Sequence, residues 1–207
     1  MKILIADDHS IVRKGLIGIL LAEFPSAEII EVCDGADAVT EAKKNLWDII
    51  LLDITMPVKN GLEALKQIRI DGIKTPVLII SMQPEDQYAV RSIKVGASGF
   101  MNKDCATDEL IKAVHKVISG RKYISVAVAE KLATSNNPDG KIGHELLSNR
   151  EMQILEFIAS GKTISDIASK ISLSINTIST YRARILEKLE LNNNAEIIRY
   201  ALDCSLV

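Results

Sequence analysis

The sequence predicts two small domains: an α/β domain built on a doubly wound, five-stranded parallel sheet, and a second domain made only of helices. Over residues 1–120, short β-branched apolar runs alternate with segments whose apolar residues have helical spacing. After Gly143 only the helical spacing remains. The 207 residues suit two small domains, and 47% are hydrophobic, which is enough for a core in each.

Five short apolar runs are predicted to be the strands of the first domain. Their length and β-branching are typical of buried parallel strands. Because ligands of doubly wound sheets bind beyond the carboxyl ends of the strands, the residues that follow each run are candidates for a site. The predicted strands are Ile3–Ala6, Ile29–Val32, Ile49–Leu52, Val77–Ile80 and Ser98–Met101.

The segments between these runs are predicted to be helices that bury one face against the sheet. Apolar residues three or four positions apart define that face. The sets are Val12, Leu16, Ile19 and Leu20; Leu62, Leu65 and Ile68; Val90, Ile93 and Val95; and Leu110, Val114 and Val117.

Composition marks the domain boundaries. Gly120 closes the α/β domain, which is predicted to span residues 1–120. A linker is expected over residues 121–146, with a short helix at Val126–Leu132 and a flexible polar stretch over residues 134–140. The all-helical domain is then expected over residues 147–207.

Capping residues predict four helices in the second domain. Ser148 and Glu151 have the spacing of a capping box, and Ser174 fits an N-cap after a turn at residues 172–174. The helices are expected from Ser148 to near Gly161, from Thr163 to about Ile171, from Ile175 to about Glu190, and from about Ala195 to Cys204.

Composition also excludes several classes of protein. No apolar run reaches the ~18 residues that a membrane helix needs, and the apolar start before Asp7 is too short for a signal peptide. We therefore expect a cytoplasmic location and no membrane partner. The cysteines Cys33, Cys105 and Cys204 lie far apart without C-x-x-C spacing, which argues against a disulfide framework or a zinc site.

The distribution of charge bears on nucleic-acid binding. The chain has a net charge of −2; residues 1–120 carry 14 Lys and Arg against 17 Asp and Glu, residues 121–147 carry 4 against 3, and residues 148–207 carry 7 of each. No domain is basic as a whole. Any nucleic-acid-binding surface is therefore expected to be a local patch.

Polar residues at the ends of four predicted strands indicate a phosphoryl-transfer site. Asp7 and Asp8 follow the first strand, Asp53 the third, Ser81 the fourth and Lys103 the fifth. Three carboxylates at one edge repel one another unless a cation neutralises them, and Mg²⁺ suits such oxygen ligands. In such a site a carboxylate attacks phosphorus, while the metal, the lysine and the hydroxyl hold the phosphoryl oxygens.

The same residues lie in sequence motifs that resemble the receiver domain of bacterial two-component response regulators, over residues 2 to about 120. The resemblance implies a flavodoxin-like sheet, a sensor histidine kinase as partner, and Asp53 as the phosphoacceptor. The motifs are Asp7-Asp8-His9, a D-x-x-M-P-x-x-N-G element from Asp53 to Gly61, Ser81-Met82, and Gly99-Phe100-Met101-Asn102-Lys103-Asp104.

The resemblance also assigns roles around the phosphoacceptor. It implies that Mg²⁺ is bound by Asp8, Asp53 and the backbone carbonyl of Thr55, with Asp7 assisting through water, and that Lys103 pairs with the phosphoryl group. His9 is instead expected at the surface, at the start of a helix, because imidazole is a poor ligand for Mg²⁺.

A conformational switch is a further implication. In receivers a hydroxyl moves toward the phosphoryl group and an aromatic ring then turns inward, which is a shift between two states. Ser81 and Phe100 occupy those positions, Phe100 three residues before Lys103. The alternative is that Phe100 is only a strand residue of the core.

The second domain resembles the four-helix LuxR-type helix-turn-helix, over most of the last 60 residues. Receiver and LuxR-type domain in this order are the arrangement of NarL/LuxR-type response regulators. This implies binding to promoter DNA as a homodimer and control of transcription, with RNA polymerase as a further partner. The last helix, with Ala195, Ile198 and Ala201, is expected either to form the dimer or to pack within its own domain.

Helical geometry divides the third helix of this domain into two faces. The packing face contains Ile178, Ile185 and Leu189, with Tyr181 and Leu186 beside them. The opposite face suits the major groove of DNA. It contains Asn176, Ser179, Thr180, Ala183, Arg184 and Glu187.

Other residues of this helix have expected roles at its edges. Arg184 has the reach to contact a phosphate or a guanine, and Arg182 and Lys188 suit contacts with the DNA backbone. Ser174 and Thr177, at the positive end of the helix, suit phosphate binding. Many relatives carry Lys where this chain has Ser179 and His where it has Tyr181. Because that lysine is absent, we expect a weaker non-specific affinity for DNA.

Three hypotheses for function follow. The leading one is a transcription regulator whose sequence-specific DNA binding is controlled by phosphorylation of Asp53, without enzymatic activity beyond the phosphorylation and dephosphorylation of that residue. The second makes the receiver a phosphorylation-independent scaffold. The third is a hydrolase with Asp53 as nucleophile, but no acid–base residue is evident for it. In the first, Thr55 and Gln83 are expected to tune access of the water that attacks the phosphoryl group.

Overall fold

The computed structural model describes residues 1–104, 106–134, 143–204 and 206. The chain divides into two compact units, residues 1–136 and 137–207. Cys105 and most of the polar stretch expected at residues 134–140 lie outside the described residues. Within them, no helix is long and apolar enough to cross a membrane.

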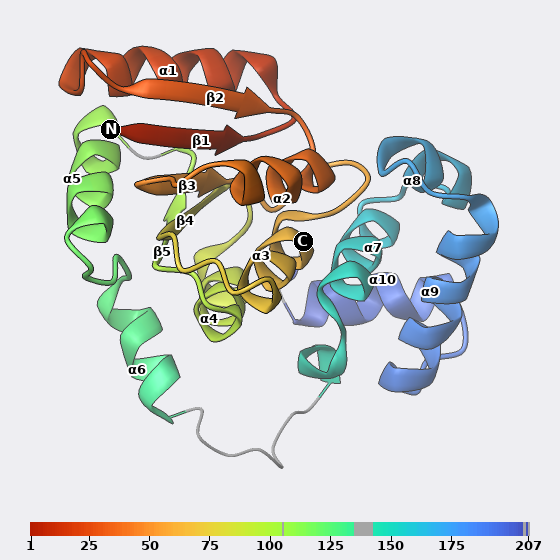
Figure 1. Ribbon diagram of the computed structural model, residues 1–207. Helices are drawn as coiled ribbons and strands as arrows, with labels where there is room; N and C mark the ends of the chain where they lie inside the picture. Colours follow the sequence, from red (N-terminus) through yellow and green to blue (C-terminus); the bar gives the residue numbers. More distant parts are fainter. Residues whose placement is uncertain (105, 135–142, 205, 207) are drawn as a thin grey trace. The chain divides into compact units, whose positions relative to one another are not determined.

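The first unit contains one parallel sheet of five strands in the order β2-β1-β3-β4-β5 (Figure 1). This confirms the doubly wound sheet, and each predicted strand is correct to within one residue at either end. In the register, Ala6 lies beside Leu52 and Ser81 beside Asn102. The strands are β1 Lys2–Ala6, β2 Glu28–Val32, β3 Ile49–Leu52, β4 Val77–Ser81 and β5 Gly99–Asn102.

Six helices accompany the sheet. Their bounds are α1 Ser10–Glu23, α2 Gly35–Lys44, α3 Gly61–Ile70, α4 Glu85–Val95, α5 Thr107–Ile118 and α6 Val126–Thr134.

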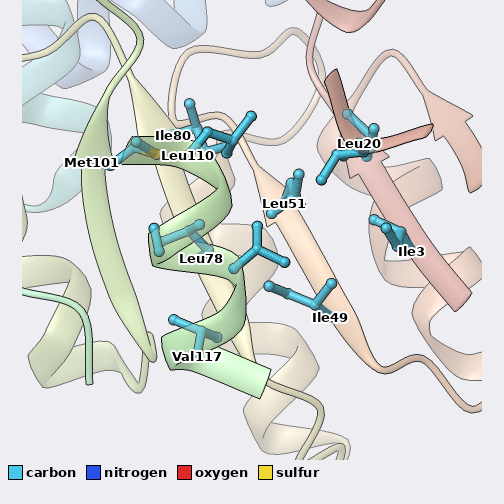
Figure 2. Close-up of a cluster of buried hydrophobic side chains, with 12 residues drawn as sticks. Ile3, Leu20, Ile49, Leu51, Leu78, Ile80, Met101, Leu110 and Val117 are labelled. Atoms are coloured by element: carbon cyan, nitrogen blue, oxygen red, sulfur yellow. The ribbon is translucent and has the colours of Figure 1, made fainter. Parts of the chain in front are cut away.

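One hydrophobic core lies between the sheet and the helices α1 and α5. Leu20 of α1 and the predicted apolar face of α5 pack against alternate residues of β1, β3 and β4 (Figure 2). Each fully buried aliphatic side chain of this kind stabilises the fold by about 1.5–3 kcal/mol. The cluster comprises Ile3, Ile5, Leu20, Ile49, Leu51, Leu78, Ile80, Met101, Leu110, Ala113, Val114 and Val117.

The edge strand departs from the prediction that all five strands are buried. In β2 the side chains of Glu28 and Glu31 are exposed and the apolar residues are only half-buried. β2 pairs with β1 alone. β2 is thus the edge strand, and its glutamates form ion pairs, Glu28 with Lys2 and Glu31 with Arg13.

The buried face of α4 also differs from the one expected. Tyr88, Ala89 and Ser92 are buried, whereas Val90 and Ile93 are only half-buried. The hydroxyl of Ser92 donates a hydrogen bond to the carbonyl of Tyr88 at 2.8 Å. Because this bond satisfies the hydroxyl inside the fold, Ser92 is buried, whereas hydrophobic spacing predicted a buried face of Val90, Ile93 and Val95.

The first unit continues beyond Gly120, into the segment predicted as linker. Tyr123 lies beside β5: its N–H donates to the carbonyl of Ser98 and its carbonyl accepts from the N–H of Phe100, both at 3.0 Å. α6 follows and packs against α4, with Val128 buried.

The second unit is all-helical, as predicted. A 3₁₀ turn at Gly143–Leu146 precedes α7 Asn149–Ala159, α8 Ile164–Lys170, α9 Ile175–Leu189 and α10 Asn194–Asp203. Capping boxes begin α7 at Ser148 and α8 at Thr163, and Ser174 caps α9. Ile197 and Ala201 of α10 are buried, and α10 contacts α7. That face of α10 packs within its own domain.

Candidate phosphoryl-transfer site and nucleic-acid interface

The carboxyl edge of the sheet brings Asp7, Asp8, Asp53 and Lys103 together. The ammonium of Lys103 lies 2.7 Å from a carboxylate oxygen of Asp7 and 2.7 Å from one of Asp53. Asp7 and Asp53 are buried and Asp8 is exposed. One side-chain atom each from Asp7, Asp8, His9 and Asp53 lies within 4.8 Å of the others. The predicted acidic cluster therefore exists, and its lysine is in contact with two of its members.

Burial dominates the electrostatics of this cluster. Loss of solvent raises the pKa of Asp53 to about 6, although Lys103 and the N–H of Thr55 lower it and Asp7 raises it further. Burial alone would lower the pKa of Lys103, but the carboxylates of Asp53 and Asp7 outweigh it and raise that pKa. The cluster contains three carboxylates and a single lysine, Lys103, so it keeps an excess of negative charge.

The donor set fits Mg²⁺. The cluster offers carboxylate oxygens from three aspartates, which are hard ligands, and its excess negative charge calls for a cation. The imidazole of His9 is 61% exposed, and its Nδ1 lies 2.7 Å from a carboxylate oxygen of Asp8. This position is consistent with the surface role expected for His9.

Close backbone packing fixes the loop that follows β3. The N–H of Gly61 donates to the carbonyl of Ile54 at 2.9 Å. A Cβ atom at position 61 would lie 1.9 Å from the carbonyl oxygen of Asp53, so a residue with a side chain does not fit. Asn60 caps α3 in a capping box with Glu63. Gly61 therefore lets the backbone at the start of α3 pack directly against that of Asp53 and Ile54.

Ser81 ends β4, and Phe100 lies in the neighbouring strand β5, beside Ile79. Ser81 is fully buried, and its hydroxyl accepts a hydrogen bond from the N–H of Gln83 at 3.1 Å. The side-chain amide of Gln83 donates to the hydroxyl of Thr55 at 3.4 Å. The ring of Phe100 is buried, and the backbone N–H of Phe100 bonds Tyr123. Sequence reasoning missed Tyr123, because one extended residue outside any apolar run has no periodicity to reveal it.

The two faces predicted for the third helix of the second domain are present in α9. Ile178 and Ile185 are fully buried. The residues expected to face outward are all exposed, namely Asn176, Ser179, Thr180, Ala183, Arg184 and Glu187.

Two family models and a set of relatives match this arrangement. The model described as response regulator receiver domain matches residues 3–115, and that of the bacterial regulatory proteins of the luxR family matches residues 145–201. The response regulator GacA of Pseudomonas aeruginosa is 31% identical over 100% of this chain and 98% of its own length. The oxygen regulatory protein NreC of Staphylococcus epidermidis is 32% identical over 100% and 99%. The chain belongs to the NarL/LuxR-type response regulators.

Solved structures of response regulators share the fold. RcsB of Salmonella enterica serovar Typhimurium, solved bound to the promoter rprA with the phosphomimetic BeF₃⁻, superposes with a TM-score of 0.63 over 97% of this chain and 98% of that chain, at 24% identity. The signal receiver domain of NarL from Mycobacterium tuberculosis is 33% identical, with a TM-score of 0.54 over 58% of this chain and 97% of that chain.

The basic side chains of α9 in this response regulator have three different environments. Arg182 donates through Nε to the side-chain carbonyl of Asn194. Lys188 lies 2.6 Å from the buried carboxylate of Glu151. The guanidinium of Arg184 lies over the ring of Tyr181, 6.0 Å from its centroid.

Lys188 has partners within its own domain that the sequence did not predict. Its ammonium pairs with Glu151 and also donates to the carbonyl of Leu146 at 3.4 Å. Glu151 is 37 residues away in sequence, so spacing along the helix gave no sign of the pair. The cation is therefore paired within the LuxR-type domain, and its predicted contact with the DNA backbone stays a prediction.

The start of α9 carries the hydroxyls predicted to bind phosphate. The Ser174 hydroxyl accepts from the N–H of Thr177 at 3.1 Å, and the two hydroxyls lie 2.8 Å apart. The hydroxyl of Thr180 donates to the carbonyl of Asn176 at 2.9 Å. These hydroxyls are hydrogen-bonded in the first turns of α9, where a DNA contact is expected.

Proposed function

We propose that a sensor histidine kinase transfers a phosphoryl group to Asp53, and that the modification controls binding of α9 to specific sequences in promoter DNA. One observation carries the first half: the buried carboxylate of Asp53 lies 2.7 Å from the ammonium of Lys103, beside the carboxylates of Asp7 and Asp8. Because promoter DNA is the target, the proposed location is the cytoplasm.

The proposed reaction is a displacement at phosphorus. An oxygen of Asp53 forms the new bond to phosphorus while the bond from phosphorus to a nitrogen of the donor breaks, and the donor keeps the electron pair. Lys103 holds a phosphoryl oxygen. Asp8, Asp53 and the Thr55 carbonyl, with Asp7 through water, would hold Mg²⁺, which supplies charge neutralisation for the carboxylates and the phosphoryl oxygens.

The chain also offers a route for the signal out of the site. In the proposed switch the hydroxyl of Ser81 donates to a phosphoryl oxygen, and Phe100 responds to the movement. The backbone N–H of Phe100 is bonded to Tyr123, which leads into α6. A displacement of β5 at Phe100 thus reaches the segment that leads to the LuxR-type domain.

Loss of the phosphoryl group is the only turnover that we propose. Gln83 and Thr55 are hydrogen-bonded to each other, and they follow Ser81 and Asp53 by two residues. There they would limit the approach of water to the acyl phosphate.

On DNA, α9 is proposed to lie in the major groove, with the chain acting as a homodimer and contacting RNA polymerase at the promoter. The proposed contacts are Ser174 and Thr177 with phosphate, Arg182 with the backbone, and the outward residues Asn176, Ser179, Thr180, Ala183 and Arg184 with base edges or phosphate. Ser174 and the outward residues are exposed, which supports this assignment, and Thr177 and Arg182 are half-buried beside them.

Intact mass measured after incubation with Mg²⁺ and phosphoramidate tests the receiver chemistry. We expect one added phosphoryl group on the wild-type chain and none on Asp53→Asn, followed by tighter DNA binding of the phosphorylated form in a gel shift. A folded wild-type chain that takes up no phosphate, or that binds DNA equally with and without it, would favour the scaffold hypothesis.

A further inference from the structure

The outward face of α9 contains a groove. It has a volume of about 300 Å³ and is lined by Asn176, Thr177, Thr180, Tyr181 and Arg184. Asn176, Thr180 and Arg184 are spaced four residues apart and follow one another along the same side of the helix. The groove thus runs along the face proposed to enter DNA, and Arg184 is the charged member of its lining.

The other two basic side chains of α9 are held outside this groove. Arg182 is hydrogen-bonded to Asn194, and Lys188 is paired with Glu151. Neither residue lines the groove. Of the cations that α9 carries, Arg184 is therefore the one placed among the side chains that would meet base edges.

The ring of Tyr181 lies under the guanidinium of Arg184. The guanidinium carbon lies 6.0 Å from the centroid of the Tyr181 ring, at the limit of a cation–π contact. The two residues are three positions apart and so are neighbours on the helix surface. An arginine that rests on an aromatic ring has fewer rotamers to lose when it binds, and the N–H groups at the edge of its plane stay free to donate.

We infer that Arg184, positioned by Tyr181, recognises a guanine in the major groove. This rests on the proposed function, since it requires α9 to lie in that groove. The planar guanidinium offers two parallel N–H donors that match O6 and N7 of guanine. Its neighbours Asn176 and Thr180 are uncharged and short enough to allow close approach of a base pair. Arg182, at the side of the helix, is the better-placed contact for phosphate.

The roles of the two residues are distinct. Arg184 touches the base, whereas Tyr181 is a positioning residue that acts through Arg184. A bidentate arginine–guanine contact discriminates between bases by about 5- to 150-fold in affinity. Arg184→Lys keeps the charge but loses the paired donors, so it should lose most of that discrimination. Tyr181→Phe keeps the ring and should keep the discrimination, while Tyr181→Ala should weaken it.

The test starts with selection of binding sites by the phosphorylated full-length chain from a random duplex library. For each variant, affinities are then titrated for four duplexes that differ only at the selected guanine. Arg182→Ala is the matched control, because it removes a cation of the same helix outside the groove. We expect Arg184→Ala to bind the four duplexes with nearly equal affinity. Arg182→Ala should lower the affinity for all four duplexes by the same factor.

Three outcomes contradict the inference, in whole or in part, and they are distinguishable. If Arg184→Ala lowers affinity equally for the four duplexes, Arg184 contacts phosphate, and the proposed function stands without this inference. The role of Tyr181 is wrong if Tyr181→Ala, folded by circular dichroism, keeps the full preference for guanine. If the phosphorylated wild-type chain selects no sequence at all, the proposed function itself fails, and the inference fails with it.

Discussion

The ammonium of Lys103 lies 2.7 Å from the carboxylate of Asp53, although the two residues are 50 positions apart in the chain. The contact exists because β3 and β5 both end at the same edge of the sheet, on either side of β4. The same ammonium also lies 2.7 Å from a carboxylate oxygen of Asp7. Lys103 is thus the cation that faces the residue proposed to carry the phosphoryl group, and its removal is expected to affect the reaction more than the fold.

Lys103→Ala should slow phosphoryl transfer to Asp53 by about 100-fold, the usual effect of deleting one preorganised donor to a charged group. The rate is measured by intact mass at fixed Mg²⁺ and phosphoramidate. Lys103→Arg is the control, since it keeps a cation at the site and should lose less. Unchanged rates in a folded Lys103→Ala chain would exclude Lys103 from the reaction.

Gly61→Ala should destabilise the receiver, because the new Cβ atom would lie 1.9 Å from the carbonyl oxygen of Asp53. Overpacking of this kind costs about 1–3 kcal/mol. Urea denaturation followed by the fluorescence of Trp47, the single tryptophan, measures it in the first unit.

The matched control for that substitution is Gly15→Ala. Gly15 lies in the exposed face of α1, and a Cβ atom added there would have no atom within 4 Å apart from its chain neighbours and the backbone of its own helix. Alanine there should stabilise the receiver by about 0.5–1 kcal/mol, since glycine weakens a helix interior. If Gly61→Ala and Gly15→Ala changed the free energy of unfolding equally, the contact with Asp53 would not be the cause of the effect at position 61.

The fold and the acidic cluster were predictable from the sequence because both depend on local patterns. Apolar runs identified the five strands, and parallel strands place the residues after them at one edge, so Asp7, Asp53 and Lys103 were expected to meet. Capping residues such as Ser148 marked helix starts correctly, since the hydrogen bonds they make lie within four residues.

The features that were missed depend on contacts that spacing does not reveal. Lys188 has the spacing of a DNA-backbone contact but finds Glu151 on α7. Tyr123 extends the sheet through two backbone hydrogen bonds that require no particular side chain. Ser92 is buried because its own helix satisfies its hydroxyl. None of these arrangements leaves a periodic signal in the sequence.

Glu190→Gly should stabilise the LuxR-type domain. Glu190 ends α9 with φ of 55°, in the left-handed region that costs an ordinary residue about 1–2 kcal/mol and glycine almost nothing. After allowance for the greater flexibility of unfolded glycine, we expect a gain of about 0.5–1 kcal/mol in the free energy of unfolding. Circular dichroism during urea denaturation measures it. Glu190→Ala keeps the strain, and a similar gain in that variant would show that loss of the charge is responsible.

The pair of Lys188 and Glu151 predicts a dependence of stability on pH. Burial by itself raises the pKa of Glu151, but hydrogen bonds from Lys188 and Ser148 outweigh it and hold that pKa below its usual value. Because the pKa is lowered in the folded state, the pair stabilises the domain above the pKa of an unfolded glutamate, about 4.3. That stability is lost as the pH falls through the lowered pKa.

Lys188→Met should therefore lower the free energy of unfolding by about 1 kcal/mol at pH 7, a modest figure because Lys188 is 37% exposed. The deficit should shrink once Glu151 is protonated, while Trp47 fluorescence reports that the receiver is unchanged. A deficit that stays constant with pH would assign the effect to packing of the lysine stem. DNA affinity should change little, whereas a backbone contact would weaken binding to every sequence and reduce its salt dependence.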